Sequence, residues 1–395
     1  MAQVRVAPPG SVRLAALPPL AAYVHLPWCV RKCPYCDFNS HERTGALPEG
    51  EYVDALVADL EALLPSVWGR RATSVFIGGG TPSLFAPASI ERLLSALRAR
   101  LPLEPDAEVT LEANPGTAEA SRFAGYRAAG VNRLSLGVQS FDDRMLAALG
   151  RIHGADEARR ALDMGLRQFD NVNVDLMYGL PGQTLAMARE DIAEAVRRGP
   201  SHVSAYQLTI EPNTVFYRKR PELPAHDACA DMQLAIEEAL GAAGYEHYET
   251  SAFARPGRRS RHNLNYWQFG DYLGLGAGAH GKLSFAERVT RHARARQPRE
   301  YLEAALHGRR GSLVEEQTVA PRELPFEFML NALRLVEGFP VELFAARTGL
   351  PLAAAETGLA EAERRGLIER DRRRIRPTER GRLFLNELLA LFLPG

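Results

Sequence analysis

The chain has 395 residues, enough for one barrel-sized domain and a second, smaller one. Hydrophobic residues make up 46% of it and charged residues 24%, which excludes disordered and collagen-like proteins. The 48 basic and 48 acidic side chains balance, so no overall field attracts nucleic acid.

Six short segments rich in apolar and β-branched residues predict buried strands, and helix-period segments lie between them. The strands are expected to begin near Tyr23, Ser74, Glu108, Asn132, Asn171 and His202. The helices are expected at residues 51–64, 89–101, 118–129, 156–166 and 184–198. Repeated βα units predict an α/β fold with a partial (β/α)6 barrel. The barrel should span residues 20–290, after an N-terminal extension of residues 1–19.

Beyond the sixth unit, a helix at 227–243, a strand-like YEHYETSAFA and a glycine-rich DYLGLGAGAHGKL are expected to cover the open side of the barrel. Residues 291–319 are expected to form a linker. Residues 320–395 then predict a helical, winged-helix-like domain with helices at 326–336, 341–348, 352–365 and 382–393. Such modules often bind DNA, but the arginines of LIERDRRRIRPTERG suit a solvated wing, so we expect no nucleic-acid partner.

The chain is expected to be cytoplasmic. No run approaches the roughly 18 apolar residues of a membrane-spanning helix, and prolines interrupt the N-terminus where a signal peptide needs an apolar segment. The apolar tail LFLNELLALFL is expected to dock against the body of the protein rather than lie on a membrane, because its flanks lack a basic face.

Three of the four cysteines lie within eight residues, in the loop after the first predicted strand. Cys29, Cys33 and Cys36 have the spacing C-x3-C-x2-C and should lie at the carboxyl edge of the barrel, where such folds place their active sites. Three thiolates can hold three irons of a cubane cluster, which leaves the fourth iron free for another ligand.

Two other interpretations of these cysteines stay open at this point. A zinc ion could be completed by His25, Asp37 or His41, and the cysteines could be merely structural. Cys229 stands alone on a predicted helix and is expected to be a small buried hydrophobic residue.

The segment YVHLPWCVRKCPYCDF and the following GGGTPS resemble the radical S-adenosylmethionine superfamily. Within it, they resemble the branch that holds oxygen-independent coproporphyrinogen III oxidase and heme chaperones. The resemblance continues through LEANPGT, VNRLSLGVQSF, DLMYGLPGQT and HNLNYWQFGDYLGLGAGAHGK, and so covers nearly the whole chain from Tyr23. It implies a [4Fe-4S] cluster held by the three cysteines and S-adenosylmethionine on the open iron.

The resemblance also implies which residues surround that cofactor. Tyr23 would lie beside it, Tyr35 would meet the adenine, and Arg151 would neutralise the carboxylate. The amino-acid end, the amino group and the ribose hydroxyls would be held by Gly80, Thr81, Glu112, Gln139 and Asp175. Read alone, the glycine run could be an ordinary βα turn, and each carboxylate could be a capping or ion-paired group.

Two departures from the oxidase pattern favour a heme chaperone. Phe38 stands where the oxidase has a further cysteine, and only 22 residues precede Tyr23, where the oxidase has a long extension. We therefore expect a protein that binds heme and transfers it to acceptor hemoproteins, without decarboxylating a porphyrinogen. The alternative is an enzyme of the coproporphyrinogen oxidase type.

A heme carrier needs an axial ligand, apolar surface for the macrocycle and cations for the propionates. The resemblance links the HNLNYW motif to heme binding, with His262 and Tyr266 as the expected heme residues. Trp267 and three preceding cations would assist, and they are Arg258, Arg259 and Arg261. His280 is a second candidate ligand, and either histidine could instead be structural. The expected partners are heme and heme-accepting proteins, with membrane-bound respiratory enzymes as candidates, and a homodimer is left open.

Overall fold

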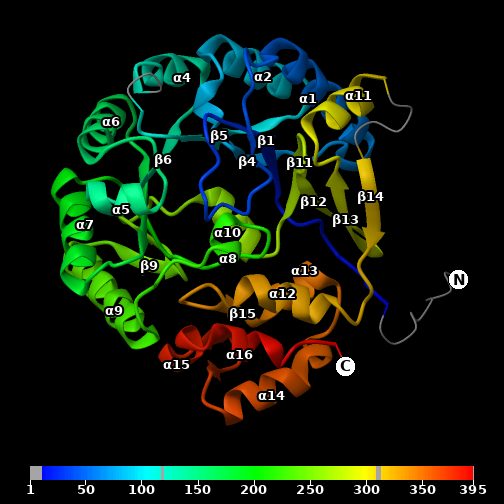
Figure 1. Ribbon diagram of the computed structural model, residues 1–395. Helices are drawn as coiled ribbons and strands as arrows, with labels where there is room; N and C mark the ends of the chain where they lie inside the picture. Colours follow the sequence, from blue (N-terminus) through cyan, green and yellow to red (C-terminus); the bar gives the residue numbers. More distant parts are fainter. Residues whose placement is uncertain (1–10, 117–119, 308–312, 395) are drawn as a thin grey trace, which may run out of the picture.

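The computed structural model describes residues 11–116, 120–307 and 313–394 (Figure 1). Six neighbouring strands of one large sheet run parallel, as expected for a partial (β/α)6 barrel. They are β1 (Leu20–Leu26), β4 (Ala72–Gly79), β5 (Leu103–Ala113), β6 (Arg133–Gln139), β7 (Val172–Tyr178) and β8 (His202–Gln207). At its other edge β1 pairs in parallel with β11 (Asp271–Leu275).

Helices surround the outer face of this sheet (Figure 1). They are α1 (Glu49–Leu63), α2 (Pro87–Arg100), α4 (Phe123–Ala129), α6 (Ala155–Gln168), α7 (Leu185–Arg198) and α9 (His226–Ala242). Their boundaries follow local chemistry: Thr184 caps α7 by accepting a hydrogen bond from the Met187 amide, and Gly199 ends it at a φ of 73°. Residues 118 and 119, where one predicted helix was to begin, lie outside the described residues.

Antiparallel strands extend the sheet at both edges. β10 (Ala252–Ala254) and β9 (Glu246–Glu249) follow β8, while β12 (His280–Phe285), β13 (Arg288–Arg294) and β14 (Leu313–Thr318) follow β11. Residues 291–319 are therefore not a linker, because they contribute the end of β13, the helix α11 (Pro298–His307) and β14. The segment looks polar in sequence, yet one of its cations is buried: Arg294 donates to buried Asp59 at 2.8 Å.

The HNLNYW segment forms the helix α10 (Arg261–Trp267), which no helical pattern in the sequence predicts. The helix has no apolar stripe, and it is stabilised by hydrogen bonds at its amino end. Ser260 caps it, and the buried Glu108 carboxylate accepts from the Arg261 and His262 amides. In Figure 1 it lies within the ring of strands. It contacts β4 near Ser74, at the start of that strand, so it lies toward the amino ends of the barrel strands.

A second core lies in the C-terminal part, around Phe328, Phe339 and Phe344. The winged-helix-like order is present as α12 (Leu324–Ala332), β15 (Phe339–Pro340), α13 (Val341–Thr348), α14 (Glu356–Arg364), β16 (Ile368–Arg370) and β17 (Arg374–Pro377). The predicted final helix is broken at Phe384 into α15 (Glu379–Leu383) and α16 (Leu385–Ala390). Leu388 is fully buried, so the apolar tail packs on this core. No helix in the described ranges has the length and apolar character needed to cross a membrane.

Candidate cluster and cofactor site

The cysteine loop is closed at its base by a short strand pair. β2 (Trp28–Cys29) pairs in parallel with β3 (His41–Glu42), directly beyond the carboxyl end of β1. Inside the loop the Cys36 amide donates to the Cys33 carbonyl at 3.1 Å. The short helix α8 (Val215–Arg218) supports the loop from outside, where the Phe216 amide donates to the Pro34 carbonyl at 3.0 Å. The three thiols therefore lie on an ordered loop at the carboxyl edge of the barrel.

These thiols line a pocket of about 400 Å³, which we call the cysteine pocket. Its other walls are the carboxyl ends of the barrel strands. The structure brings together here every residue predicted for the cluster and cofactor except Tyr23: Cys29, Cys33, Cys36, Tyr35, Gly80, Thr81, Glu112, Gln139, Arg151 and Asp175. Residues from six different segments thus converge on one cavity, as parallel strands of a barrel allow.

Arg151 is a fixed cation beside the cysteine loop. Its guanidinium donates to the Cys33 sulfur at 3.6 Å, to Asn114 Oδ1 at 2.7 Å and to the Gly137 carbonyl at 2.8 Å. Its buried Nε has no hydrogen-bond partner among the described residues. Asn114 also donates to Thr81 Oγ1 at 3.0 Å. The chain thus holds a positive group at the pocket wall with one donor unused.

Asn114 is a site residue that the sequence reasoning missed. It lines the cysteine pocket and fixes both Arg151 and Thr81. A signal was present, because Asn114 stands in the LEANPGT motif two residues after Glu112. An asparagine at the end of a strand is usually interpreted as a turn residue, so its role in holding Arg151 and Thr81 was not predicted.

Two carboxyl groups face the same pocket. Glu112 Oε2 accepts from the Gly79 amide at 3.0 Å, and Asp175 accepts from Asn173 at 2.8 Å and from Ser135 at 3.3 Å. Burial raises the pKa of Glu112 to about 8, and the neighbouring Asp175 adds to the shift. Burial likewise raises the pKa of Asp175. Such a pair favours a positively charged ligand, which would stabilise both ionised forms.

The backbone of the pocket is shaped for close approach. Gly79 has a φ of 119°, and a Cβ atom on Gly80 would lie 2.6 Å from the Trp28 carbonyl oxygen, so a side chain is excluded at both positions. Gln139 has a φ of 71°, an unfavourable conformation for a residue with a side chain. Strain of this kind at the end of β6, in the pocket wall, is typical of functional sites.

The zinc alternative fits the structure poorly. The Asn39 carbonyl only accepts, so His25 Nε2 donates to it at 2.8 Å, and Nδ1 then accepts from the Tyr23 hydroxyl at 2.8 Å. Neither nitrogen is free for a metal. In the described ranges no three His, Cys, Asp or Glu side chains surround one point closely enough for a metal ion, whereas a cubane holds its irons at separate corners. The three thiols line one pocket beside the Arg151 cation, which fits a cluster of net negative charge, and Cys229 is buried elsewhere on α9.

The residues predicted for heme lie apart from the cysteine pocket. His262 is only 2% exposed, and its ring stacks on Phe76 at 5.0 Å and meets Tyr266 edge-on at 5.0 Å. Its Nδ1 is 2.9 Å from Ser74 Oγ. Burial lowers the pKa of His262 to about 3, with the charge of Arg133 adding to the effect, so the ring stays neutral. A heme could reach it only if α10 moved out of the barrel.

Several other residues predicted to assist heme binding contact other side chains in the structure. Arg259 pairs with Glu246 and Glu337, and Arg261 with Asp106 and Glu104. Trp267 lies beneath the Arg334 guanidinium at 4.6 Å. His280 is exposed at the start of β12.

A buried chain of hydrogen bonds crosses the barrel from the cysteine pocket to α10. Asp175 accepts from Asn173, whose Oδ1 lies 2.6 Å from His202 Nδ1. His202 Nε2 is 2.8 Å from the Tyr248 hydroxyl, which also accepts from the amide of Ser260, the cap of α10. The pocket and the helix are thus parts of one polar network inside the barrel.

Comparison with known proteins agrees with this geometry. Residues 23–195 match the radical SAM superfamily, and residues 319–384 match the HemN C-terminal domain. The heme chaperone HemW of Escherichia coli K12 is 49% identical over 385 residues, which covers 96% of this chain and 100% of that protein. The heme chaperone HemW of Haemophilus influenzae is 48% identical, covering 95% of this chain and 98% of that protein.

Among solved structures, the coproporphyrinogen III oxidase HemN of Escherichia coli superposes with a TM-score of 0.80. The match covers 95% of this chain and 90% of that one, at 23% sequence identity. At that identity it establishes the fold alone, from the barrel through the C-terminal domain.

Proposed function

Because the chain belongs to the HemW family within the radical SAM superfamily, we propose that it is a heme chaperone, which binds heme and transfers it to acceptor hemoproteins. The observation that carries the proposal is the 49% identity with the Escherichia coli heme chaperone over the full length of that protein. The oxidase alternative is supported only by a shared fold, at 23% sequence identity.

The cysteine pocket would hold the resident cofactors. Cys29, Cys33 and Cys36 would bind a [4Fe-4S] cluster and leave one iron facing the pocket, where S-adenosylmethionine would bind. When bound and reduced, such a cluster can donate an electron to the sulfonium of that cofactor. The support is the convergence of three thiols, one cation and two carboxyl groups on one cavity.

The residues around the pocket would orient the cofactor. Arg151 would bind its carboxylate through the unpartnered Nε, while Glu112 and Asp175 would face its positive and hydroxyl groups. Four further pocket residues would contact the amino-acid end, the ribose or the adenine, and they are Gly80, Thr81, Gln139 and Tyr35. Tyr23 would support the cofactor site from below the glycine run. Its hydroxyl is hydrogen-bonded to His25, whose ring lies against Gly79.

The heme contacts predicted from HNLNYW need a change in the structure. Heme ligation by His262 and Tyr266 would require α10 to leave the barrel and break the network that ends at Ser260. The acceptor proteins would include membrane-bound respiratory enzymes, reached from the cytoplasm. A homodimer would be compatible with this activity.

A transfer assay under anaerobic conditions tests the function. The full-length protein, reconstituted with iron and sulfide, is loaded with ferric heme and mixed with apomyoglobin as a reporter acceptor. We expect stoichiometric uptake followed by appearance of the holomyoglobin spectrum. With coproporphyrinogen III, S-adenosylmethionine and a reductant we expect no loss of carboxyl groups. Catalytic conversion to protoporphyrinogen, or failure to bind and release heme, would contradict the proposal.

A further inference from the structure

Side chains of the cysteine pocket form hydrogen bonds with the sulfur atoms that would hold the cluster. The Arg151 guanidinium donates to the Cys33 sulfur at 3.6 Å, and the Cys36 sulfur lies 3.7 Å from the Ser40 hydroxyl. Hydrogen bonds to the sulfur atoms of an iron–sulfur cluster raise its reduction potential, because they stabilise the additional negative charge of the reduced form. The donors around these thiols therefore influence how readily the cluster would accept an electron.

The third thiol has a donor of the same kind. Burial raises the pKa of the Cys29 thiol, and a hydrogen bond with the Thr81 side chain acts against that shift. The Thr81 hydroxyl oxygen accepts from Asn114 Nδ2 at 3.0 Å, which leaves the hydroxyl hydrogen free to be donated to the sulfur. Thr81 is almost fully buried, so solvent does not compete for this hydrogen.

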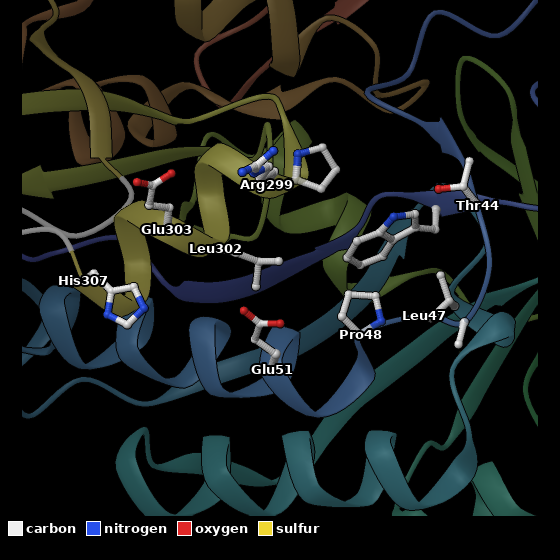
Figure 2. Close-up of a pocket in the computed structure, with 11 residues that line it drawn as sticks. Thr44, Leu47, Pro48, Glu51, Arg299, Leu302, Glu303 and His307 are labelled. Atoms are coloured by element: carbon white, nitrogen blue, oxygen red, sulfur yellow. The ribbon is translucent and has the colours of Figure 1, made fainter.

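The other side of the cysteine loop is occupied by a separate cavity of about 460 Å³ between α1 and α11 (Figure 2). Glu51 of α1 lines it, together with Arg299 and Glu303 of α11. Trp28 also lines this cavity, whereas the three thiols line the cysteine pocket. In the part of the chain that the structure describes, the side-chain donors to the sulfur atoms therefore come from the pocket side.

Asn114 holds two of these donors in place. Its Oδ1 accepts from the Arg151 guanidinium at 2.7 Å, and its Nδ2 donates to the Thr81 hydroxyl at 3.0 Å. Its own backbone is anchored, since the Asn114 amide donates to the hydroxyl of fully buried Ser83 at 3.3 Å. One side-chain amide therefore orients the donors to two of the three sulfur atoms.

The amide group of Asn114 suits this role because it accepts at one atom and donates at the other. A carboxylate at this position would only accept, so the Thr81 hydroxyl would donate its hydrogen to the carboxylate and lose its bond to the sulfur. A carboxylate would also place a negative charge beside Arg151 and the cluster. An apolar side chain would hold neither donor.

We propose that Asn114 is a positioning residue that raises the reduction potential of the cluster through the two donors it holds, Arg151 and Thr81. This inference rests on the proposed function, in which the cysteine pocket holds a [4Fe-4S] cluster. On reduction the cluster gains one electron, and a low-potential one-electron donor is oxidised. The added negative charge is stabilised by the hydrogen bonds to the Cys29 and Cys33 sulfur atoms.

The test is a redox titration of the full-length, anaerobically reconstituted protein, with dithionite as reductant and the electron paramagnetic resonance signal of the reduced cluster as readout. Asn114→Asp keeps the shape of the side chain, removes the donor to Thr81 and adds a negative charge. At the wild-type midpoint, the ratio of reduced to oxidised cluster should fall roughly tenfold, which corresponds to about 59 mV for one electron. Asn386→Asp, at an exposed position on α16, is the matched control and should match wild type.

Two further variants separate positioning from a merely structural role. Thr81→Val removes only the donor to Cys29, Ser40→Ala removes only the partner of Cys36, and each should lower the potential by a smaller amount. Because Asn114 acts through Thr81, the shift of the double variant Asn114→Asp/Thr81→Val should be smaller than the sum of the single shifts. The shifts of Asn114→Asp and Ser40→Ala should add.

The outcomes separate this inference from the function on which it rests. Wild-type protein that assembles no four-iron cluster contradicts the cofactor assignment, and this inference with it. Wild type that holds the cluster but transfers no heme contradicts the chaperone function alone. A wild-type potential in Asn114→Asp, or additive shifts of Asn114→Asp and Thr81→Val, overturns the role of Asn114. If Asn114→Asp assembles no cluster, the potential of Thr81→Val decides, and an unchanged value overturns the inference.

Discussion

The cysteine pocket and the α10 region lie at opposite ends of one barrel. They differ in whether their polar side chains face a cavity or are packed against partners. In the pocket, Arg151 keeps an unpartnered Nε, and burial raises the pKa of two carboxyl groups although the charge of Arg133 acts against the shift. Around α10, Arg259 and Arg261 are paired with acids and His262 is packed among aromatic rings. Charged groups that converge on an open cavity mark a ligand site, whereas the two buried α10 nitrogens that have no hydrogen-bond partner, His262 Nε2 and Trp267 Nε1, line no such cavity among the described residues.

The largest effect is expected at the cysteine loop. Cys33→Ala should abolish cluster absorbance, because removal of one of three thiolates leaves two irons without a protein ligand. The fold should persist, since Cys33 lies on a loop and is only half-buried. Absorbance and iron content after anaerobic reconstitution measure this. Cys229→Ala is the matched control, and an intact four-iron cluster in Cys33→Ala would remove that residue from the ligand set.

A second prediction for the same pocket concerns Glu112, whose pKa is raised to about 8. A carboxyl group with a raised pKa lowers the free energy of unfolding as pH rises, here between about pH 4.5 and 8. Glu112→Gln should therefore stabilise the ligand-free protein by about 2 kcal/mol near pH 8 and flatten this pH dependence. It should also weaken S-adenosylmethionine binding roughly tenfold.

Denaturant unfolding at several pH values and calorimetric titration measure the two effects of Glu112→Gln. The control is Glu91→Gln, at an exposed position on α2. A variant as sensitive to pH as wild type, with unchanged cofactor affinity, would show that Glu112 does not face the cofactor.

At α10 we expect a stability effect in place of a ligand effect. His262→Ala removes a buried ring and leaves Ser74 without its partner, so the free energy of unfolding should fall by about 2–4 kcal/mol. Cluster absorbance should be unchanged. Denaturant unfolding, with Asn263→Ala on the same helix as control, measures this. Unaltered stability together with loss of heme binding would return His262 to the heme site.

The smallest effect is expected in the network that joins the two regions. Tyr248→Phe removes the hydroxyl between His202 and the Ser260 amide and should lower the free energy of unfolding by about 1 kcal/mol. Tyr217→Phe, at an exposed tyrosine, should have no effect. Equal unfolding midpoints for both variants would mean that this network of hydrogen bonds does not couple the cysteine pocket to α10.

The sequence was most informative where a pattern repeats. The six parallel strands were predicted because apolar runs alternate with helix-period segments, whereas the cofactor residues of the pocket were predicted from the resemblance to the radical S-adenosylmethionine superfamily. Two features escaped. α10 is held by the Glu108 carboxylate, which lies 154 residues away along the chain from His262. The sequence of β13 looks polar because the partner of its buried Arg294 is Asp59, which lies 235 residues away along the chain. Single-sequence patterns carry local periodicity and no record of such distant pairing.

Mössbauer spectroscopy of the anaerobically reconstituted protein, with and without S-adenosylmethionine, tests the central claim most directly. The account predicts a [4Fe-4S] cluster in which one iron of four changes its isomer shift when the cofactor is added, because three irons are bound by cysteine and one is open. Four equivalent irons whose spectrum does not change when the cofactor is added would contradict the account. Material that contains zinc without iron would contradict it as well.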